Sequence, residues 1–277
     1  MKMKGKTVFV RIAVPALVLG LLLTGCGKKY RDLDTIKKKG ELVMFTDARW
    51  APFEYIGEES REAGVDIDLG QAIADELGVK LKIINADFDG FSLAVQNGQA
   101  DMAIAAITIT EERKETLDFS DPYTNSCQYI LKHESNTALL SVNDLAGYKV
   151  GVHLGTTGDF LVSSQITDGV LTGTGAEVVQ YKSLQEASLA LMKGDLGAIV
   201  CDDLLAKNLA VVNRGLTCFE ARFADGSIEE EFYGVAVAKG NTSLLEAVNG
   251  AVKKLLARDF VNQRLEYHIP RSQIEME

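Results

Sequence analysis

The chain has 277 residues, with 39 acidic and 29 basic side chains and a formal net charge of −10 at pH 7. An acidic chain repels the phosphate backbone, so this composition argues against nucleic acid as a partner. Three cysteines lie beyond residue 26 (Cys127, Cys201 and Cys218); their spacing fits neither a disulfide scaffold nor a metal site, and we expect buried thiols, with one bridge as the alternative.

The N-terminus carries the features of a secretion signal. Basic residues precede the apolar run "IAVPALVLGLLLT", which is too short for a membrane-spanning helix. The segment that follows, Leu23-Thr24-Gly25-Cys26, resembles the lipobox of bacterial lipoproteins, in which the cysteine is lipidated and becomes the first residue. We therefore expect a signal peptide over residues 1–25 and an extracytoplasmic protein anchored to the membrane by lipidated Cys26. An ordinary signal peptide is the alternative. Removing residues 1–25, which hold four basic and no acidic side chains, lowers the net charge to −14.

Beyond this region, strand and helix signals alternate. The first unit reads strand, helix, strand, helix, strand over residues 41–46, 66–78, 79–84, 91–98 and 100–107. Its first helix places Leu69, Ile73 and Leu77 on one stripe and ends at Gly78. Its last strand, "ADMAIAAI", is apolar throughout, as is typical of a strand buried on both faces.

A second unit repeats the pattern. It has strands over 148–153, 176–181 and 196–201, and helices that begin near Thr157 and span 184–194. Two such units predict an α/β protein of two lobes, each with an open, mainly parallel sheet flanked by helices.

In open parallel sheets, ligands bind beyond the carboxyl ends of the strands. The residues at these positions would line one cleft if the lobes faced each other; they are 47–50, 87–88, 106–110, 153–157 and 202–203.

The segment "AITITEERKETLDFSDPY" is suited to holding an anion. Thr108 and Glu111 have the spacing of a capping box, which predicts a helix start with free N–H groups and hydroxyls near Thr108 and Thr110. Arg113 follows within one turn, and its guanidinium can bind a carboxylate through two parallel hydrogen bonds.

The second lobe supplies a complementary set. In "HLGTTGDF", Gly155 permits close backbone approach, and Thr156 and Thr157 can donate to an anion. Another apolar strand ends in the carboxylate of Asp202. An α-amino acid carries one carboxylate and one ammonium, so Arg113 and Asp202 match its two ends.

With these motifs in place, the chain resembles the extracytoplasmic solute-binding proteins of ABC transporters for polar amino acids, the group of glutamine-, histidine- and lysine/arginine/ornithine-binding proteins. The resemblance rests on "TDARWAPFEY", "GVDIDLGQAIADELGVKL", "DFDGFSLAVQNGQADMAIAAITITEERKETLDFSDPY", "VGVHLGTTGDF" and "FYGVAVAKG", which occur in the family's order and spacing. It implies the two-lobed periplasmic-binding-protein fold of type II.

The resemblance also implies roles for single residues. Arg113 would hold the α-carboxylate with Thr108 and Thr157, while Asp202 would take the α-ammonium. Ala106, often Gly or Ser in the family, would offer its carbonyl to the ammonium. The side chain of the ligand would pack against the aromatic rings of Trp50 and Phe88. Asp47 would select which ligand side chains are accepted.

The family's chain path crosses twice between the lobes. By this resemblance 121–127 and 229–233 are the hinge strands, so lobe 1 comprises 27–122 and 233–277 and lobe 2 comprises 123–232. A terminal helix over 243–265 would pack back on lobe 1. The resemblance further implies a monomer without cofactor or metal that closes around its ligand and delivers it to permease subunits.

The alternative is a cyclohexadienyl or arogenate dehydratase-like enzyme, since that activity occurs on the same fold. Only His153 is a conspicuous acid–base candidate, and we expect it to line the pocket instead. For the ligand, Asp47 and Trp50 favour a cationic amino acid (arginine, lysine, ornithine or histidine), with glutamine or cystine as alternatives. A protonated His153 would argue against a cation.

Overall fold

The computed structural model describes residues 29–276. The predicted signal peptide and the predicted lipidation site, Cys26, lie outside the described residues. Within 29–276, no helix is both long enough and apolar enough to cross a membrane.

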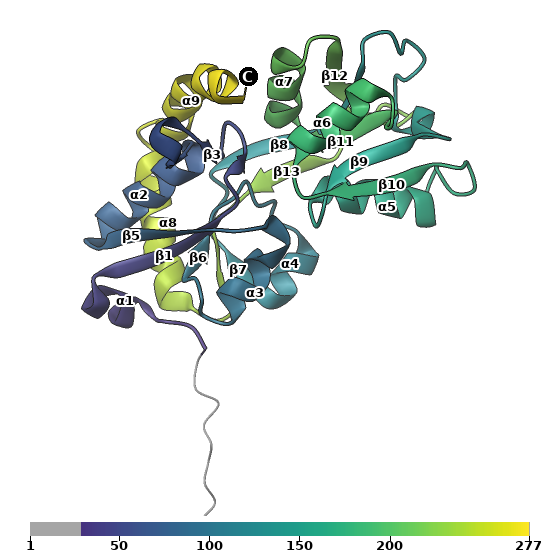
Figure 1. Cartoon of the computed structure of the whole chain (residues 1–277). Coiled ribbons are helices and arrows are strands. Elements are labelled where there is room, and N and C mark those ends of the chain that lie inside the picture. Colours follow the sequence, from purple (N-terminus) through teal and green to yellow (C-terminus); the bar gives the residue numbers. More distant parts are fainter. Residues whose placement is uncertain (1–28, 277) are drawn as a thin grey trace, which may run out of the picture.

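The first lobe is built on a five-stranded sheet (Figure 1). In order across the sheet, its strands are β5 (Lys80–Asn85), β1 (Glu41–Thr46), β6 (Met102–Ala103), β14 (Ala236–Ala238) and β7 (Leu117–Phe119). Side chains alternate along β1, so Leu42 and Met44 pack on one face and Val43 and Phe45 on the other. The first face is covered by α1 (Leu33–Lys39), α2 (Val65–Leu77) and α8 (Thr242–Leu256), and the second by α3 (Phe91–Gln96).

The second lobe has a six-stranded sheet. Its strands are β10 (Glu177–Tyr181), β9 (Lys149–His153), β11 (Ala198–Asp202), β8 (Thr124–His133) and β12 (Leu216–Glu220), with β13 (Glu230–Tyr233) paired to β8. One face is covered by α6 (Leu184–Lys193) and α7 (Asp203–Val212), the other by α5 (Thr157–Thr167).

Each sheet is parallel over three strands and antiparallel over the others. The expected mainly parallel sheet is therefore a mixed one. The antiparallel strands arise because the chain re-enters each sheet from the other lobe, through β8 and β14.

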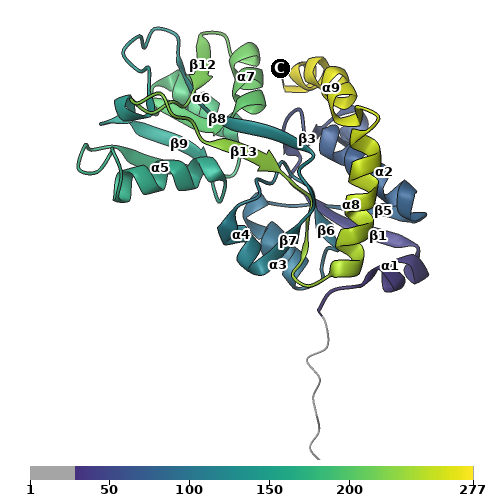
Figure 2. The ribbon, with the colours of Figure 1, turned by 180° about the vertical axis from the view of Figure 1, so that it is seen from behind.

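Two strands run side by side between the lobes (Figure 2). They are β8 and β13, which pair antiparallel with Tyr233 opposite Thr124 and Glu230 opposite Cys127. A small sheet of β2 (Arg49–Trp50), β3 (Glu54–Ile56) and β4 (Glu62–Ala63) follows β1 and lies close to this crossing.

The structure differs from the predicted elements at the strand over 100–107, at the start of the helix that follows it, and at the terminal helix. The strand expected over 100–107 is reduced to β6, because the backbone turns away at Ala106, whose φ is 46°. The cap of α4 (Glu111–Thr116) is Thr110 instead of Thr108; its side chain accepts a hydrogen bond from the Arg113 N–H. The predicted capping box was therefore wrong.

The terminal helix expected over 243–265 is two helices, α8 and α9 (Phe260–Met276), because Asp259 between them adopts a left-handed φ of 57°. Whereas α8 packs on α2 of the first lobe, α9 packs on both α2 and α7. Asn208 on α7 donates from Nδ2 to Ser272 Oγ on α9 over 3.2 Å. The end of the chain therefore contacts both lobes.

The three cysteines within residues 29–276 are free thiols, of which Cys201 is buried. Burial raises the pKa of each of them.

Candidate functional site

A pocket lies between the lobes, at the carboxyl ends of β1, β6, β9 and β11. Its cavity volume is about 10 Å³, roughly the room for one water molecule, so the lobes are closed over the pocket in this structure. The lining residues are Asp47, Trp50, Glu54, Phe88, Ala105, Ala106, Thr108, Arg113, His153, Thr156, Thr157 and Asp202. The fold thus brings together all ten residues predicted from the sequence, and it adds Glu54 and Ala105.

Arg113 lies on the first turn of α4 and reaches both lobes. Its Nη1 donates to the Thr108 carbonyl over 2.7 Å and its Nη2 to the Gly155 carbonyl over 3.1 Å. The guanidinium lies 5.6 Å from the Phe88 ring centroid and 5.5 Å from that of Phe91. Burial lowers the pKa of Arg113, although the charges of Glu231 and Asp202 oppose this effect. Among residues 29–276, no carboxylate lies within salt-bridge distance of Arg113. Its positive charge is therefore available to bind an anion.

Ala106 adopts a backbone conformation that is uncommon outside glycine. A left-handed φ costs roughly 1–2 kcal/mol for an L-residue, and here φ is 46°. The Ala106 N–H donates to Asp66 Oδ2 over 2.7 Å, which holds this conformation in place. The strained residue lies at the pocket wall, where the resemblance implies a backbone contact to the ligand.

The hydroxyl groups of Thr156 and Thr157 differ in their hydrogen bonds. Thr156 caps α5: its hydroxyl donates to the His153 carbonyl over 2.8 Å and accepts from the Asp159 N–H. Its only hydroxyl proton is therefore engaged, whereas the sequence analysis expected a donor to an anion. Thr157 Oγ1 lies 3.3 Å from Gln128 Nε2 and 3.5 Å from Thr108 Oγ1, so the threonine hydroxyls of the two lobes face each other.

Asp202 ends β11 and is 3 % exposed. It accepts hydrogen bonds from Gln128 Nε2 over 2.7 Å and from the Tyr233 hydroxyl. Burial raises the pKa of Asp202 well above its usual range, and the nearby Glu231 raises it further. An ammonium group at this carboxylate would supply the charge that the site lacks.

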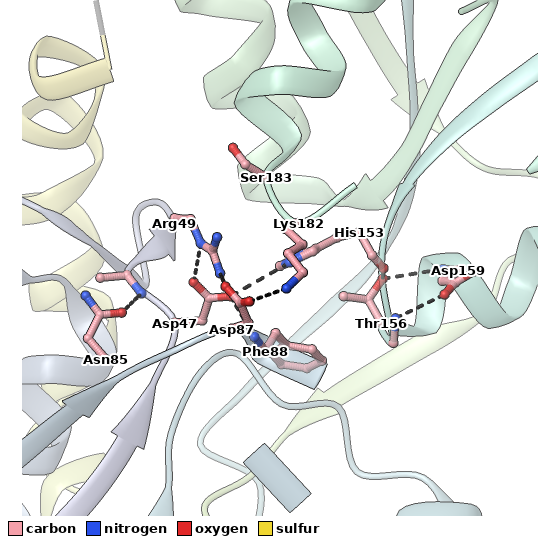
Figure 3. A network of polar contacts seen from close by, with 12 residues as sticks. Asp47, Arg49, Asn85, Asp87, Phe88, His153, Thr156, Asp159, Lys182 and Ser183 are labelled. Carbon is pink, nitrogen blue, oxygen red and sulfur yellow. Dashed lines mark hydrogen bonds and ion pairs between the residues drawn. The ribbon is translucent and has the colours of Figure 1, made fainter. Parts of the chain in front are cut away.

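Asp47 is already occupied by a neighbouring cation (Figure 3). Arg49 Nε and Nη2 bind Asp47 Oδ1 and Oδ2 over 2.6 and 2.7 Å, and Nη2 also binds Asp87 Oδ1 over 2.8 Å. Lys182 of the second lobe reaches Asp87 over 2.5 Å, so the network spans both lobes. The pKa of Arg49 is raised by its hydrogen bond to Asp47. Sequence reasoning overlooked Arg49, although it stands two residues from Asp47.

His153 lies between the two aromatic walls. Its ring centroid is 5.5 Å from that of Trp50, in a stacked arrangement, and 5.8 Å from that of Phe88. Burial lowers the pKa of His153 more than Asp47 raises it, which favours the neutral imidazole. His153 is therefore a third wall of the pocket, and its Nδ1 has no hydrogen-bond partner within the described residues.

Glu54 is the main site residue that sequence reasoning missed. Its side chain is fully buried, and neither of its oxygens has a donor among residues 29–276. It lies beside Asp66, whose Oδ2 accepts from the Tyr123 hydroxyl over 2.9 Å. Burial raises the pKa of Glu54 well above its usual range and that of Asp66 to about 6. The pair therefore shares a proton. A glutamate inside the otherwise apolar run "WAPFEY" was the available signal.

The residues described by the structure contain no group of three or more His, Cys, Asp or Glu side chains arranged to hold a metal ion. The pocket is lined by charged, hydroxyl and aromatic side chains.

Comparisons with known proteins agree with this geometry. Residues 42–269 match the sequence profile of the bacterial extracellular solute-binding proteins, family 3. An L-arginine-binding protein of Pseudomonas aeruginosa is 32% identical over 214 residues, 76% of this chain and 81% of that protein. The L-cystine-binding protein TcyJ of Escherichia coli is 28% identical over 255 residues, 91% of this chain and 90% of that protein. The crystal structure of the substrate-binding protein AbpA of Streptococcus pneumoniae bound to L-arginine superposes with a TM-score of 0.79 at 30% identity, covering 86% of this chain and 98% of that one. The two-lobed periplasmic-binding-protein fold predicted from the sequence is confirmed.

The shared proton of Glu54 and Asp66 leads to a pH-dependent prediction. Because the folded state raises the pKa of Asp66 to about 6, it binds a proton more tightly than the unfolded chain, and stability falls as pH rises from about 4 to about 6. In Asp66→Asn the amide oxygen can still accept from Ala106 and Tyr123, and the amide nitrogen can donate to Glu54. We expect this variant to gain roughly 1–2 kcal/mol of unfolding free energy at pH 7. Its fall in stability between pH 4 and 6 should be shallower than that of the wild type, although Glu54 and Asp202, whose pKa values are also raised, still contribute to it.

Urea unfolding at pH 4, 5, 6 and 7 measures both effects. Asp75→Asn is the control, because Asp75 lies exposed on the same helix. A variant that is less stable than the wild type at pH 7 and keeps the wild-type pH dependence would contradict the shared proton.

Proposed function

Because the chain belongs to the bacterial extracellular solute-binding proteins, family 3, we propose that it binds a polar L-amino acid, preferentially a cationic one, between its two lobes and delivers it to the permease of an ABC importer. The observation that carries this proposal is the placement of Arg113 and Asp202. They face one void from opposite lobes, and the guanidinium has no carboxylate partner among the described residues.

The amino-acid head group matches this arrangement. The α-carboxylate binds Arg113 and the hydroxyls of Thr108 and Thr157, and the α-ammonium binds Asp202. Each charged hydrogen bond contributes about 1.5–3 kcal/mol. Several of them support micromolar affinity, which corresponds to about −8 kcal/mol.

The preference for a cationic side chain rests on Glu54. Since Arg49 already binds both oxygens of Asp47, the buried carboxyl oxygens that lack a donor among the described residues are both oxygens of Glu54 and Oδ1 of Asp66. A ligand ammonium or guanidinium that reaches this pair takes the place of its shared proton, while Trp50 and Phe88 pack on the aliphatic stem. A neutral His153 removes the repulsion that a protonated imidazole would exert.

Of the three similar proteins named above, two are named with arginine and one with cystine. We therefore rank arginine, lysine, ornithine and histidine first, and glutamine and cystine second.

We further propose where the chain divides into lobes, how the lobes close and how the protein is anchored. Lobe 1 comprises 27–122 and 233–277, lobe 2 comprises 123–232, and β8 and β13 flex as the lobes close. The protein acts as a monomer that lipidated Cys26 anchors to the outer side of the membrane. The named relatives are binding proteins, and we propose that this chain, too, is not an enzyme; product formation from prephenate or arogenate would support the dehydratase alternative instead.

A ligand screen tests the function directly. We expect the soluble chain that begins after Cys26 to bind a cationic amino acid in calorimetry against the twenty amino acids, ornithine and cystine. A ligand at 100 times its dissociation constant stabilises the folded state by about 2.7 kcal/mol, so a thermal-shift screen can select candidates. Binding of none of these compounds would rule out the proposed function.

Replacing Arg113 tests the carboxylate site. We expect Arg113→Ala to weaken binding at least 100-fold, about 2.7 kcal/mol, because the ligand carboxylate loses its charged partner. Lys114→Ala is the matched control, since Lys114 lies next to Arg113 and pairs with the exposed Glu111. Retention of affinity within threefold would show that Arg113 does not hold the carboxylate.

Replacing Glu54 tests selectivity. Glu54→Gln keeps the volume but cannot ionise, so we expect the ratio of affinities for the cationic ligand and for glutamine to fall about tenfold, or 1.4 kcal/mol. Glu58→Gln, an exposed position on the segment after β3, is the control. An unchanged ratio in calorimetry would assign the selection to another group, Asp47 being the first candidate.

A further inference from the structure

Glu231 is a buried carboxylate on one of the two strands that cross between the lobes. It lies on β13 and is 4 % exposed, whereas its neighbour Glu230 points to solvent. Glu231 does not line the pocket, yet it contacts residues that do.

The contacts of Glu231 come from both lobes. Thr108 Oγ1 donates to its Oε2 over 2.9 Å, and Gln128 Nε2 donates to its Oε1 over 3.0 Å. The Thr157 hydroxyl and the positive charge of Arg113 also favour the ionised form of this carboxyl group, and so counteract the effect of burial, which raises its pKa.

These partners are the donors of the proposed α-carboxylate site. A threonine hydroxyl has a single proton, so Thr108 cannot donate to Glu231 and to a ligand carboxylate at the same time. A ligand carboxylate at Arg113 and at these hydroxyls would also repel the nearby carboxylate of Glu231. The ligand and Glu231 are therefore alternatives at these groups.

The opposite end of the site shows a parallel contact. Gln128 Nε2, which binds Glu231, also donates to Asp202 Oδ1 over 2.7 Å, where the ligand ammonium would bind. The side chains of Glu231 and Gln128 thus present an acceptor to Thr108 and a donor to Asp202, as the head group of an amino acid would.

We propose that Glu231 is a positioning residue that acts in place of the ligand α-carboxylate. In the empty closed protein it binds Thr108 of the first lobe and Gln128, which lies beside Asp202 of the second lobe. The ligand can bind only when these two side chains are released from Glu231. The inference rests on the proposed function for the identity of the ligand head group.

This arrangement has a thermodynamic consequence. Any contact that stabilises the closed empty form but is lost on binding weakens the observed affinity by the same factor. Removing the carboxylate should therefore open the empty protein and tighten ligand binding at once. A residue with a purely structural role would not produce these two effects together.

The test compares Glu231→Gln and Glu231→Ala with the wild type and with Glu230→Gln, which removes the same charge one residue away on the exposed side of β13. Calorimetry gives the affinity for the amino acid selected by the screen, and small-angle X-ray scattering gives the radius of gyration without ligand. We expect both Glu231 variants to bind about threefold to tenfold more tightly and to have a larger radius when empty, while Glu230→Gln matches the wild type.

Weaker binding by folded Glu231 variants would overturn the proposal, because Glu231 would then contribute to the ligand site. Unchanged affinity and radius would overturn it as well. Melting curves separate either result from misfolding, and Glu231→Gln preserves the side-chain volume. If the wild type binds no amino acid, the proposed function fails, whereas an unchanged radius in the empty variants contradicts the role of Glu231 independently.

Discussion

Each carboxylate that is buried between the lobes needs a cation, hydrogen-bond donors or a proton. The charge and the contacts of the site depend on which of these partners each carboxylate has. Glu54, Asp66, Asp47, Asp202 and Glu231 are all at most 4 % exposed. Arg49 neutralises Asp47, a shared proton serves Glu54 and Asp66, and hydroxyl and amide donors serve Asp202 and Glu231. Ionised groups are costly to bury without such partners. The proposed zwitterionic, cationic ligand would supply the charges that this region lacks.

The strands that cross between the lobes supply part of that compensation. Tyr123, just before β8, donates to Asp66 of the first lobe, and Tyr233 at the end of β13 donates to Asp202 of the second. Glu231 and Gln128 come from the same two strands. The segments that connect the lobes are thus hydrogen-bonded to the acidic groups on both sides of the pocket.

Local sequence patterns explain where prediction succeeded. The apolar run of β1 and the stripe on α2 depend on neighbouring residues only, so the bounds of both elements were predicted within one position. The strand-end rule predicted that Asp47, Thr108 and Asp202 line one cleft, with Arg113 one helical turn beyond Thr108. Prediction failed where the backbone departs from regular geometry: at Ala106, which ends β6 early, and at Asp259, which divides the terminal helix.

The sequence by itself determined the two α/β lobes, the family and the ring of residues around the pocket, because periodicity, strand ends and motif order are carried by the chain itself. Only the tertiary structure decided the state of each charge. Arg49 binds Asp47 because a turn after β1 folds it back, Glu54 meets Asp66 because β3 packs on α2, and Glu231 meets Thr108 because a crossing strand passes behind the pocket. Arg49 and Asp47 are near neighbours in the chain, whereas Glu231 and Thr108 are 123 positions apart. Partners so distant meet only when the chain has folded.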